Sequence, residues 1–188
     1  NNRENIFHDE QDYKAFMFRL GLSLGFEDKE LLDYPEFSLP YSRVRITNMK
    51  KELFYLHAFC LMKSHFHILI EQRTDISISK LLSKLCTSYA MYVNKKYGRV
   101  GHIFQDQFKS VLIESEPQLM WASAYIHMNP VKDKLVNHPN QYKWSSYMDY
   151  INYRNLPVVN TKFLLSVFGN KNNLEAQTIK ITDAKDAP

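Results

Sequence analysis

The sequence contains few of the residues that build disulfide frameworks, zinc sites or membrane spans. It has two cysteines, Cys60 and Cys86, among 188 residues, and their spacing fits neither a metal-binding nor a redox motif. We interpret both as small hydrophobic side chains in a reducing compartment. No eighteen consecutive residues are apolar, and the chain opens on polar residues. We therefore expect no membrane span, no signal peptide and a cytoplasmic location.

The length and composition predict one folded domain. Hydrophobic residues make up 45% of the chain and aromatic residues 14%, which is enough for a substantial core. We expect a single domain over residues 1–169. Within it, residues 28–50 carry Pro35 and Pro40 and form an irregular insertion. The polar residues 170–188 are expected to be a mobile C-terminal tail.

Positive charge is concentrated in the middle of the chain. The formal net charge is only +4, but residues 51–100 carry eight basic and three acidic side chains, a net +5, whereas residues 1–50 sum to −2. A basic surface suits a nucleic-acid partner, because phosphate contacts supply much of the affinity. Solvated lysine faces are also common in proteins that bind no nucleic acid, so this signal alone is weak.

Hydrophobic periodicity predicts a mixture of helices and strands. Gly98 is expected to end one helix, and Pro130 to end or kink another at Asn129. The residues from 144 to 169 are expected to cover one edge of the domain. The expected helices span 8–25, 76–97 and 114–129, and the expected strands span 53–62, 65–70 and 108–113.

Two histidines stand two residues apart inside one expected strand. Side chains at i and i+2 of a strand point to the same face, so His65 and His67 can converge on one divalent cation. Two neutral imidazoles suit Mn²⁺ and other first-row metals, and a DNA phosphate oxygen can complete a Mg²⁺ shell. The alternative is a pair of hydrogen-bonded imidazoles with no metal.

A second pair, Tyr125 and Asn129, has the i,i+4 spacing that places two side chains on one face of a helix. A phenol is a weak nucleophile at neutral pH unless a cation or a hydrogen bond favours its ionised form. Asn129 could offer its amide oxygen as a third metal ligand. His127 lies on a different side of this helix, as a structural or DNA-facing residue. Together the two pairs indicate phosphodiester chemistry with a tyrosine nucleophile, although twelve tyrosines make chance pairs easy.

Six segments in order resemble the HUH-type single-tyrosine transposases, and within them the REP-associated tyrosine transposases. This resemblance covers residues 1 to about 147. Two features depart from the pattern: a first strand that usually precedes the opening Asn-Asn-Arg is not in this sequence, and residues 28–50 are longer than the usual connection. The six segments are residues 1–7, 57–67, 97–105, 108–110, 125–132 and 144–147.

The resemblance implies an α+β, ferredoxin-like HUH fold with helices on a central antiparallel sheet. It also implies Mg²⁺- or Mn²⁺-dependent cleavage and rejoining of hairpin-containing single-stranded DNA through a 5′-phosphotyrosine. By motif, His65 and His67 are the metal ligands and Tyr125 is the nucleophile. Asn129 stands where related transposases have a metal-binding Gln. From the resemblance we also expect a bacterial protein that is associated with the nucleoid when it is bound to DNA.

Two other functions remain open at this point: a DNA-binding protein on the same fold that does not cleave, and a metal phosphodiesterase that uses water and leaves Tyr125 dispensable. Both a monomer and a homodimer fit the resemblance. Stacking aromatic and basic side chains suit a structured single strand. The expected DNA contacts are Lys95, Lys96, Arg99, His102, Lys109 and Lys132.

Overall fold

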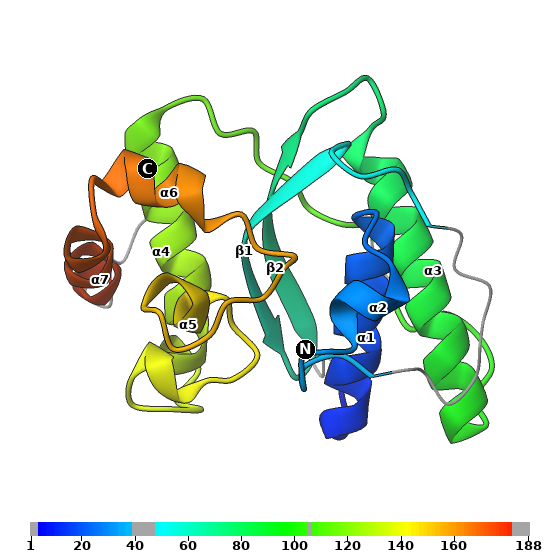
Figure 1. The fold of residues 1–188 in the computed structure, drawn as a ribbon. Helices are drawn as coiled ribbons and strands as arrows, with labels where there is room; N and C mark the ends of the chain where they lie inside the picture. The colour runs from blue at the N-terminus through cyan, green and yellow to red at the C-terminus, as the bar shows by residue number, and fades with distance from the viewer. Residues whose placement is uncertain (1–3, 39–47, 105–106, 182–188) are drawn as a thin grey trace. The chain divides into compact units, whose positions relative to one another are not determined.

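A computed structural model describes residues 4–38, 48–104 and 107–181, and shows helices together with a two-stranded antiparallel sheet (Figure 1). The expected α+β class is confirmed. The chain divides into two compact units, one formed by residues 1–55 and 72–109 and the other by residues 56–71 and 110–188. The expectation of one domain over residues 1–169 stays a prediction.

The first unit contains helices α1 (Glu10–Ser23), α2 (Asp28–Leu31) and α3 (Ile78–Tyr97), and α1 packs against α3. The Asp9 side chain caps α1 by accepting a hydrogen bond from the Asp12 backbone N–H at 3.0 Å. Gly98 ends α3 in the left-handed conformation, with φ of 61°, as expected. Two of the expected helices are therefore present, shortened by a few residues at their ends.

A buried carboxylate joins α1 to α3. Asp12 is fully buried and accepts hydrogen bonds from the Tyr92 hydroxyl at 3.0 Å and the Lys96 ammonium at 2.7 Å. Burial opposes the charged form of Lys96, but hydrogen bonds to Asp12 and Asp9 outweigh it and raise the pKa of Lys96. A charge in a core is tolerated when it is paired in this way, and the cluster links the two helices across the core of this unit.

The second unit is built on the hairpin of β1 (Phe54–Met62) and β2 (His65–Gln72), joined by the two-residue turn Lys63–Ser64; the outer ends of both strands belong to the first unit. The other edge of β1 is also paired. The Leu61 N–H donates to the Trp144 carbonyl at 2.8 Å, and the Asn160 N–H donates to the Leu56 carbonyl at 2.8 Å. Two stretches of the region 144–169 therefore lie along β1, while its role at an edge of the domain stays a prediction.

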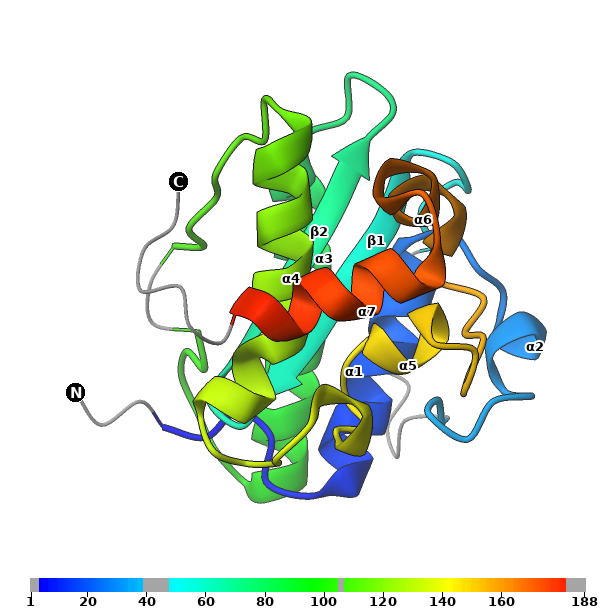
Figure 2. The same ribbon diagram turned by 90° about the vertical axis from the view of Figure 1, so that its left-hand side faces the viewer.

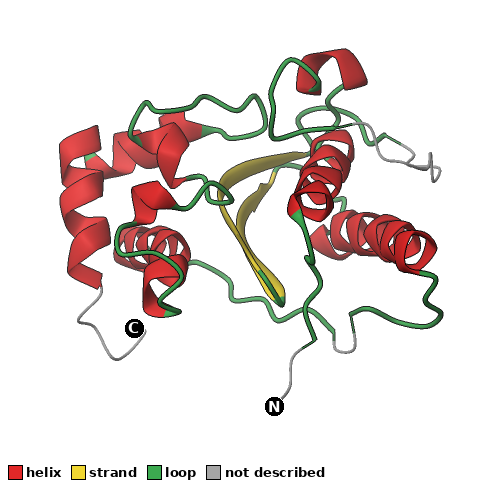
Figure 3. Cartoon of the chain, turned by 90° about the horizontal axis from the view of Figure 1, so that it is seen from below, coloured by secondary structure: helices red, strands yellow, loops and turns green. Residues whose placement is uncertain are grey.

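The helices of this unit are α4 (Glu116–Lys132), η1 (Pro139–Gln141), α5 (Tyr147–Tyr150), α6 (Thr161–Phe168) and α7 (Lys171–Lys180). Helix α4 contacts η1, α6 and α7, and α7 crosses it at a steep angle (Figure 2). Outside β1 and β2, the described chain consists of helices and loops (Figure 3). No helix among the described residues is long and apolar enough to span a bilayer.

Three local predictions need correction. Residues 107–114 are not a strand, because β structure requires a paired neighbour that local propensity cannot supply. Helix α4 continues through Pro130 to Lys132; Asn129 accepts from the Asp133 N–H at 2.9 Å, so the last turn still closes. Residues 171–180 of the expected tail form α7, which buries Leu174 and Thr178. The insertion holds the short helix α2, while Pro40 lies outside the described residues.

Candidate active site

The two expected metal-ligating histidines lie side by side on β2. Their ring centroids are 4.8 Å apart, with the planes nearly perpendicular at 85°, as the i,i+2 spacing requires. Nδ1 of His65 lies 3.1 Å from the Ser64 hydroxyl. A hydrogen bond on one ring nitrogen is the usual way that a metal-ligating imidazole is oriented, and the contact with Ser64 is of this kind.

Helix α4 brings Tyr125 to this pair. The Tyr125 ring lies edge-on to the His67 ring, with centroids 5.9 Å apart and an interplanar angle of 90°. Helix α4 starts at Ser115, whose hydroxyl accepts from the Gln118 N–H at 3.3 Å, and Pro117 occupies its first turn. Tyr125 is half-buried, and its hydroxyl has no hydrogen-bond partner within the described part of the chain. The phenol is thus near the imidazoles and uncommitted.

Asn129 presents its amide oxygen one turn further along. Its side-chain nitrogen donates to the Tyr125 carbonyl at 2.8 Å. A carbonyl only accepts, so the amide nitrogen must face it and Oδ1 must point to the other side. Asn129 is 6% exposed, and Oδ1 has no hydrogen-bond partner among the residues described. An amide oxygen with no partner in these ranges can serve as a ligand of a divalent cation.

The two histidines alone do not make a structural zinc site, which uses four Cys or His ligands. Within the described ranges, no group of three or more His, Cys, Asp or Glu side chains is arranged to hold a metal ion. A site on His65 and His67 therefore needs a further ligand of another kind. The Asn129 oxygen and substrate phosphate oxygens are of that kind, so the residues present are compatible with the expected Mg²⁺ or Mn²⁺.

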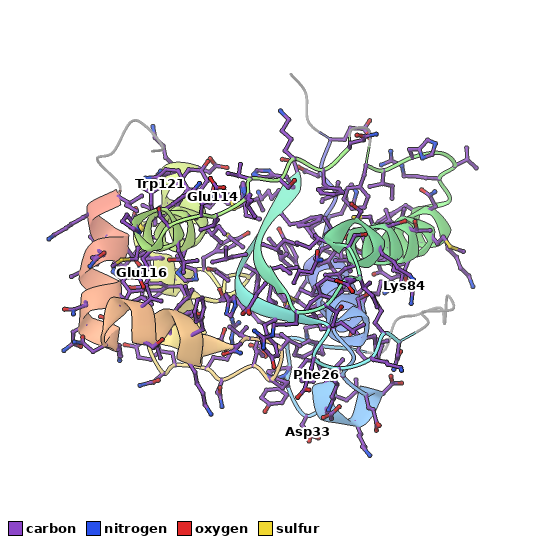
Figure 4. All side chains as sticks on the ribbon, turned by 90° about the horizontal axis from the view of Figure 1, so that it is seen from above. Phe26, Asp33, Lys84, Glu114, Glu116 and Trp121 are labelled. Atoms are coloured by element: carbon purple, nitrogen blue, oxygen red, sulfur yellow. The ribbon has the colours of Figure 1, made fainter. Side chains whose placement is uncertain are left out.

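Two further side chains pack on the Tyr125 ring. The indole of Trp121, on the same helix (Figure 4), is stacked on Tyr125 with centroids 4.9 Å apart and planes inclined by 19°. The Lys132 ammonium lies 4.4 Å from the Tyr125 ring centroid, and burial lowers the pKa of Lys132. Both groups therefore pack on the ring of the candidate nucleophile.

Sequence reasoning missed Trp121, and it treated Lys132 as a DNA contact only. The signal was present for both, because i−4 and i+7 positions lie along one face of a helix. What the spacing could not give is the choice of rotamer, which decides whether an indole stacks on a neighbouring ring or turns to solvent.

The other expected DNA contacts all belong to the first unit. They differ in whether an acidic side chain already pairs with them. Lys96 pairs with Asp9 and Asp12, both at 2.7 Å, and Arg99 pairs with Glu4 at 2.8 Å. Lys95, His102 and Lys109 are exposed. Exposed Lys95 and Lys109 are therefore better placed to meet phosphate than Lys96, whose ammonium already pairs with the buried carboxylate of Asp12.

His127 has a structural position, which is one of the two interpretations expected for it. It is fully buried, and Nε2 lies 2.9 Å from the Ser146 hydroxyl. That hydroxyl also accepts from the Phe59 backbone N–H on β1 at 2.9 Å. Desolvation lowers the pKa of His127 to about 3, so the ring is neutral at physiological pH. It ties α4 to β1 through one hydroxyl.

Residues 37–129 match the model of a protein family described as "Transposase IS200 like". The matched stretch contains both strands, both histidines and Tyr125, and it ends at Asn129. No curated protein and no solved structure matches the chain.

Proposed function

We propose, from the place in the IS200-like transposase superfamily that this match supports, that the chain is a metal-dependent DNA strand transferase of the tyrosine HUH type. In this proposal it belongs to the REP-associated branch, acts in the cytoplasm on hairpin-containing single-stranded DNA, and cleaves and rejoins it. The observation that carries the proposal is the approach of the Tyr125 ring to the touching imidazoles of His65 and His67.

In the proposed reaction, the Tyr125 phenolic oxygen attacks phosphorus in line with the 3′ oxygen that leaves. The phenol proton goes to water, the Oη–P bond forms and the P–O3′ bond breaks, while the 3′ oxygen takes a proton from water. The products are a 5′-phosphotyrosine and a free 3′-hydroxyl, and rejoining reverses the same bonds. His65, His67 and Asn129 would hold a divalent cation, which supplies charge stabilisation to the phosphoryl oxygens when bound.

A covalent-trapping experiment tests this proposal. The protein is mixed with Mn²⁺ and a pool of single-stranded oligonucleotides that carry a hairpin beside a randomised flank. We expect a protein–DNA adduct on a denaturing gel, and the masses of its proteolytic peptides should place the nucleotide on Tyr125. Tyr125→Phe should abolish the adduct, and chelation of the metal should prevent it. Tyr153→Phe is the matched control, because Tyr153 is a tyrosine of the same unit with 69% exposure.

Two outcomes would overturn the proposal in favour of the alternatives. If wild type and Tyr125→Phe both hydrolyse the pool without an adduct, the protein is a phosphodiesterase that uses water. If the pool is bound with no cleavage of any member, the protein is a non-cleaving DNA-binding protein.

A further inference from the structure

The Tyr125 ring contacts three side chains of its own unit. The Trp121 indole stacks at 4.9 Å, the Lys132 ammonium lies 4.4 Å from the ring centroid, and the His67 ring meets it edge-on at 5.9 Å. An aromatic ring has a negative face and a positive edge, so an ammonium over its face is attractive. The hydroxyl, by contrast, has no partner in the described part of the chain.

These contacts limit the rotamers that the Tyr125 side chain can adopt. A tyrosine side chain on a helix can occupy alternative staggered χ1 states, and in another rotamer the ring would leave the histidines. The stacked indole and the ammonium together favour the state that faces His67. Holding a reacting group in its attack geometry before the substrate arrives lowers the barrier to reaction.

We propose that Trp121 and Lys132 are positioning residues of strand cleavage, which hold the Tyr125 ring in the orientation that faces His67 through a stacked indole and an ammonium over the ring. This inference rests on the proposed function. Trp121 acts through a flat apolar surface, whereas Lys132 acts through its charge, and the two therefore call for different substitutions.

For Trp121 the informative pair is Trp121→Phe, which keeps an aromatic surface, and Trp121→Leu, which keeps apolar bulk without one. We expect Trp121→Leu to slow single-turnover adduct formation by roughly 10- to 100-fold, the size of effect that misplacing a reacting group produces. Trp121→Phe should restore most of the rate. The affinity for the oligonucleotide, measured in a Tyr125→Phe background, should not change. Met120→Ala, on the same helix, is the control.

For Lys132 the pair is Lys132→Met, which keeps the aliphatic stem, and Lys132→Arg, which keeps a cation over the ring. Positioning predicts a slower rate at saturating DNA for Lys132→Met and rescue by Lys132→Arg, with the dissociation constant unchanged. If Lys132→Met only weakens binding, Lys132 is a phosphate contact and its positioning role is refuted.

Thermal unfolding of each variant separates misfolding from misplacement, since a variant that keeps the wild-type melting temperature cannot owe its slower rate to unfolding. If Trp121→Leu folds and reacts at the wild-type rate, the inference about Trp121 fails while the proposed function stands. If wild type forms no adduct at all, the proposed function itself fails, so the two failures are distinguishable.

Discussion

One hydrogen bond sets the orientation of the Asn129 side-chain amide. Its amide nitrogen is committed to the Tyr125 carbonyl, which leaves the oxygen as its only free donor atom toward a metal. We expect Asn129→Ala to weaken Mn²⁺ binding in the absence of DNA by on the order of tenfold or more, measured by calorimetric titration. Asn129→Asp should bind at least as tightly as wild type, because a carboxylate is a stronger oxygen ligand.

Controls for this titration come from the same unit. His65→Ala should remove binding if the imidazoles are ligands, and Asn172→Ala, an exposed position on α7, should leave it intact. An unchanged Mn²⁺ affinity in Asn129→Ala, alongside a loss in His65→Ala, would show that the amide oxygen is not a ligand.

For single residues, spacing in the sequence predicted which site residues lie close together, but not which other side chains contact them. The periods of strand and helix were enough to place His65 beside His67 and to set Asn129 one turn beyond Tyr125. The hydroxyl of Ser64 on the His65 ring and the indole of Trp121 on Tyr125 depend on side-chain rotamers. Rotamers are selected by packing between elements, and packing cannot be obtained from a local pattern.

At the scale of elements, α4 is joined to β1 by the contact of buried His127 with Ser146. The folded protein holds His127 neutral down to pH about 3, whereas an ordinary histidine protonates near 6.5. Below pH 6.5 the unfolded chain therefore binds a proton that the folded chain does not. The contribution of His127 to the free energy of unfolding is therefore fully present above pH 6.5. It falls by about 1.4 kcal/mol per pH unit as the pH drops from there toward 3.

We expect this histidine alone to lower the free energy of unfolding by about 2 kcal/mol between pH 7 and pH 5. Urea denaturation at the two pH values measures it. His127→Gln, which keeps a group able to bond Ser146, should lose this part of the pH dependence. His102→Gln, at an exposed position, should retain it. Equal pH dependence in all three proteins would contradict a buried neutral His127.

Elements whose signals are local were predictable, and those that depend on distant partners were not. Helix α3 has apolar residues at helical spacing and Gly98 at its end, so its place followed from the sequence. The segment at 107–114 has the residue types of a strand but no strand pairing. Helix α7 has a largely polar sequence and is stabilised by burial of Leu174 and Thr178. The hydrophobic pattern alone does not predict such a helix.

For the molecule as a whole, net charge is a poor guide to the cations available to DNA. The formal excess is +4, yet several basic side chains are already neutralised by internal partners. Lys96 pairs with two carboxylates, Arg99 with Glu4, and Arg154 with the buried Asp149 at 2.7 Å. Charge counting along the sequence located the basic region, but only the structure separates paired from unpaired cations.

This distinction predicts how DNA binding responds to salt. Each phosphate of a single strand that a protein cation neutralises contributes about −0.7 to the slope of log K against log salt. Lys95 and Lys109 are exposed and form no ion pair among the described residues. Replacing both by Gln in the Tyr125→Phe background should therefore flatten the slope by about 1.4, measured by fluorescence anisotropy with a hairpin oligonucleotide.

The matched control changes the net charge equally at paired positions. Lys14 lies 3.3 Å from Glu10, and Lys29 lies 3.0 Å from Glu27. Replacing these two lysines by Gln should leave the slope close to wild type, because neither releases a counterion from DNA. If both double variants flatten the slope to the same degree, binding follows the overall charge of the protein and not the unpaired cations of residues 95–109.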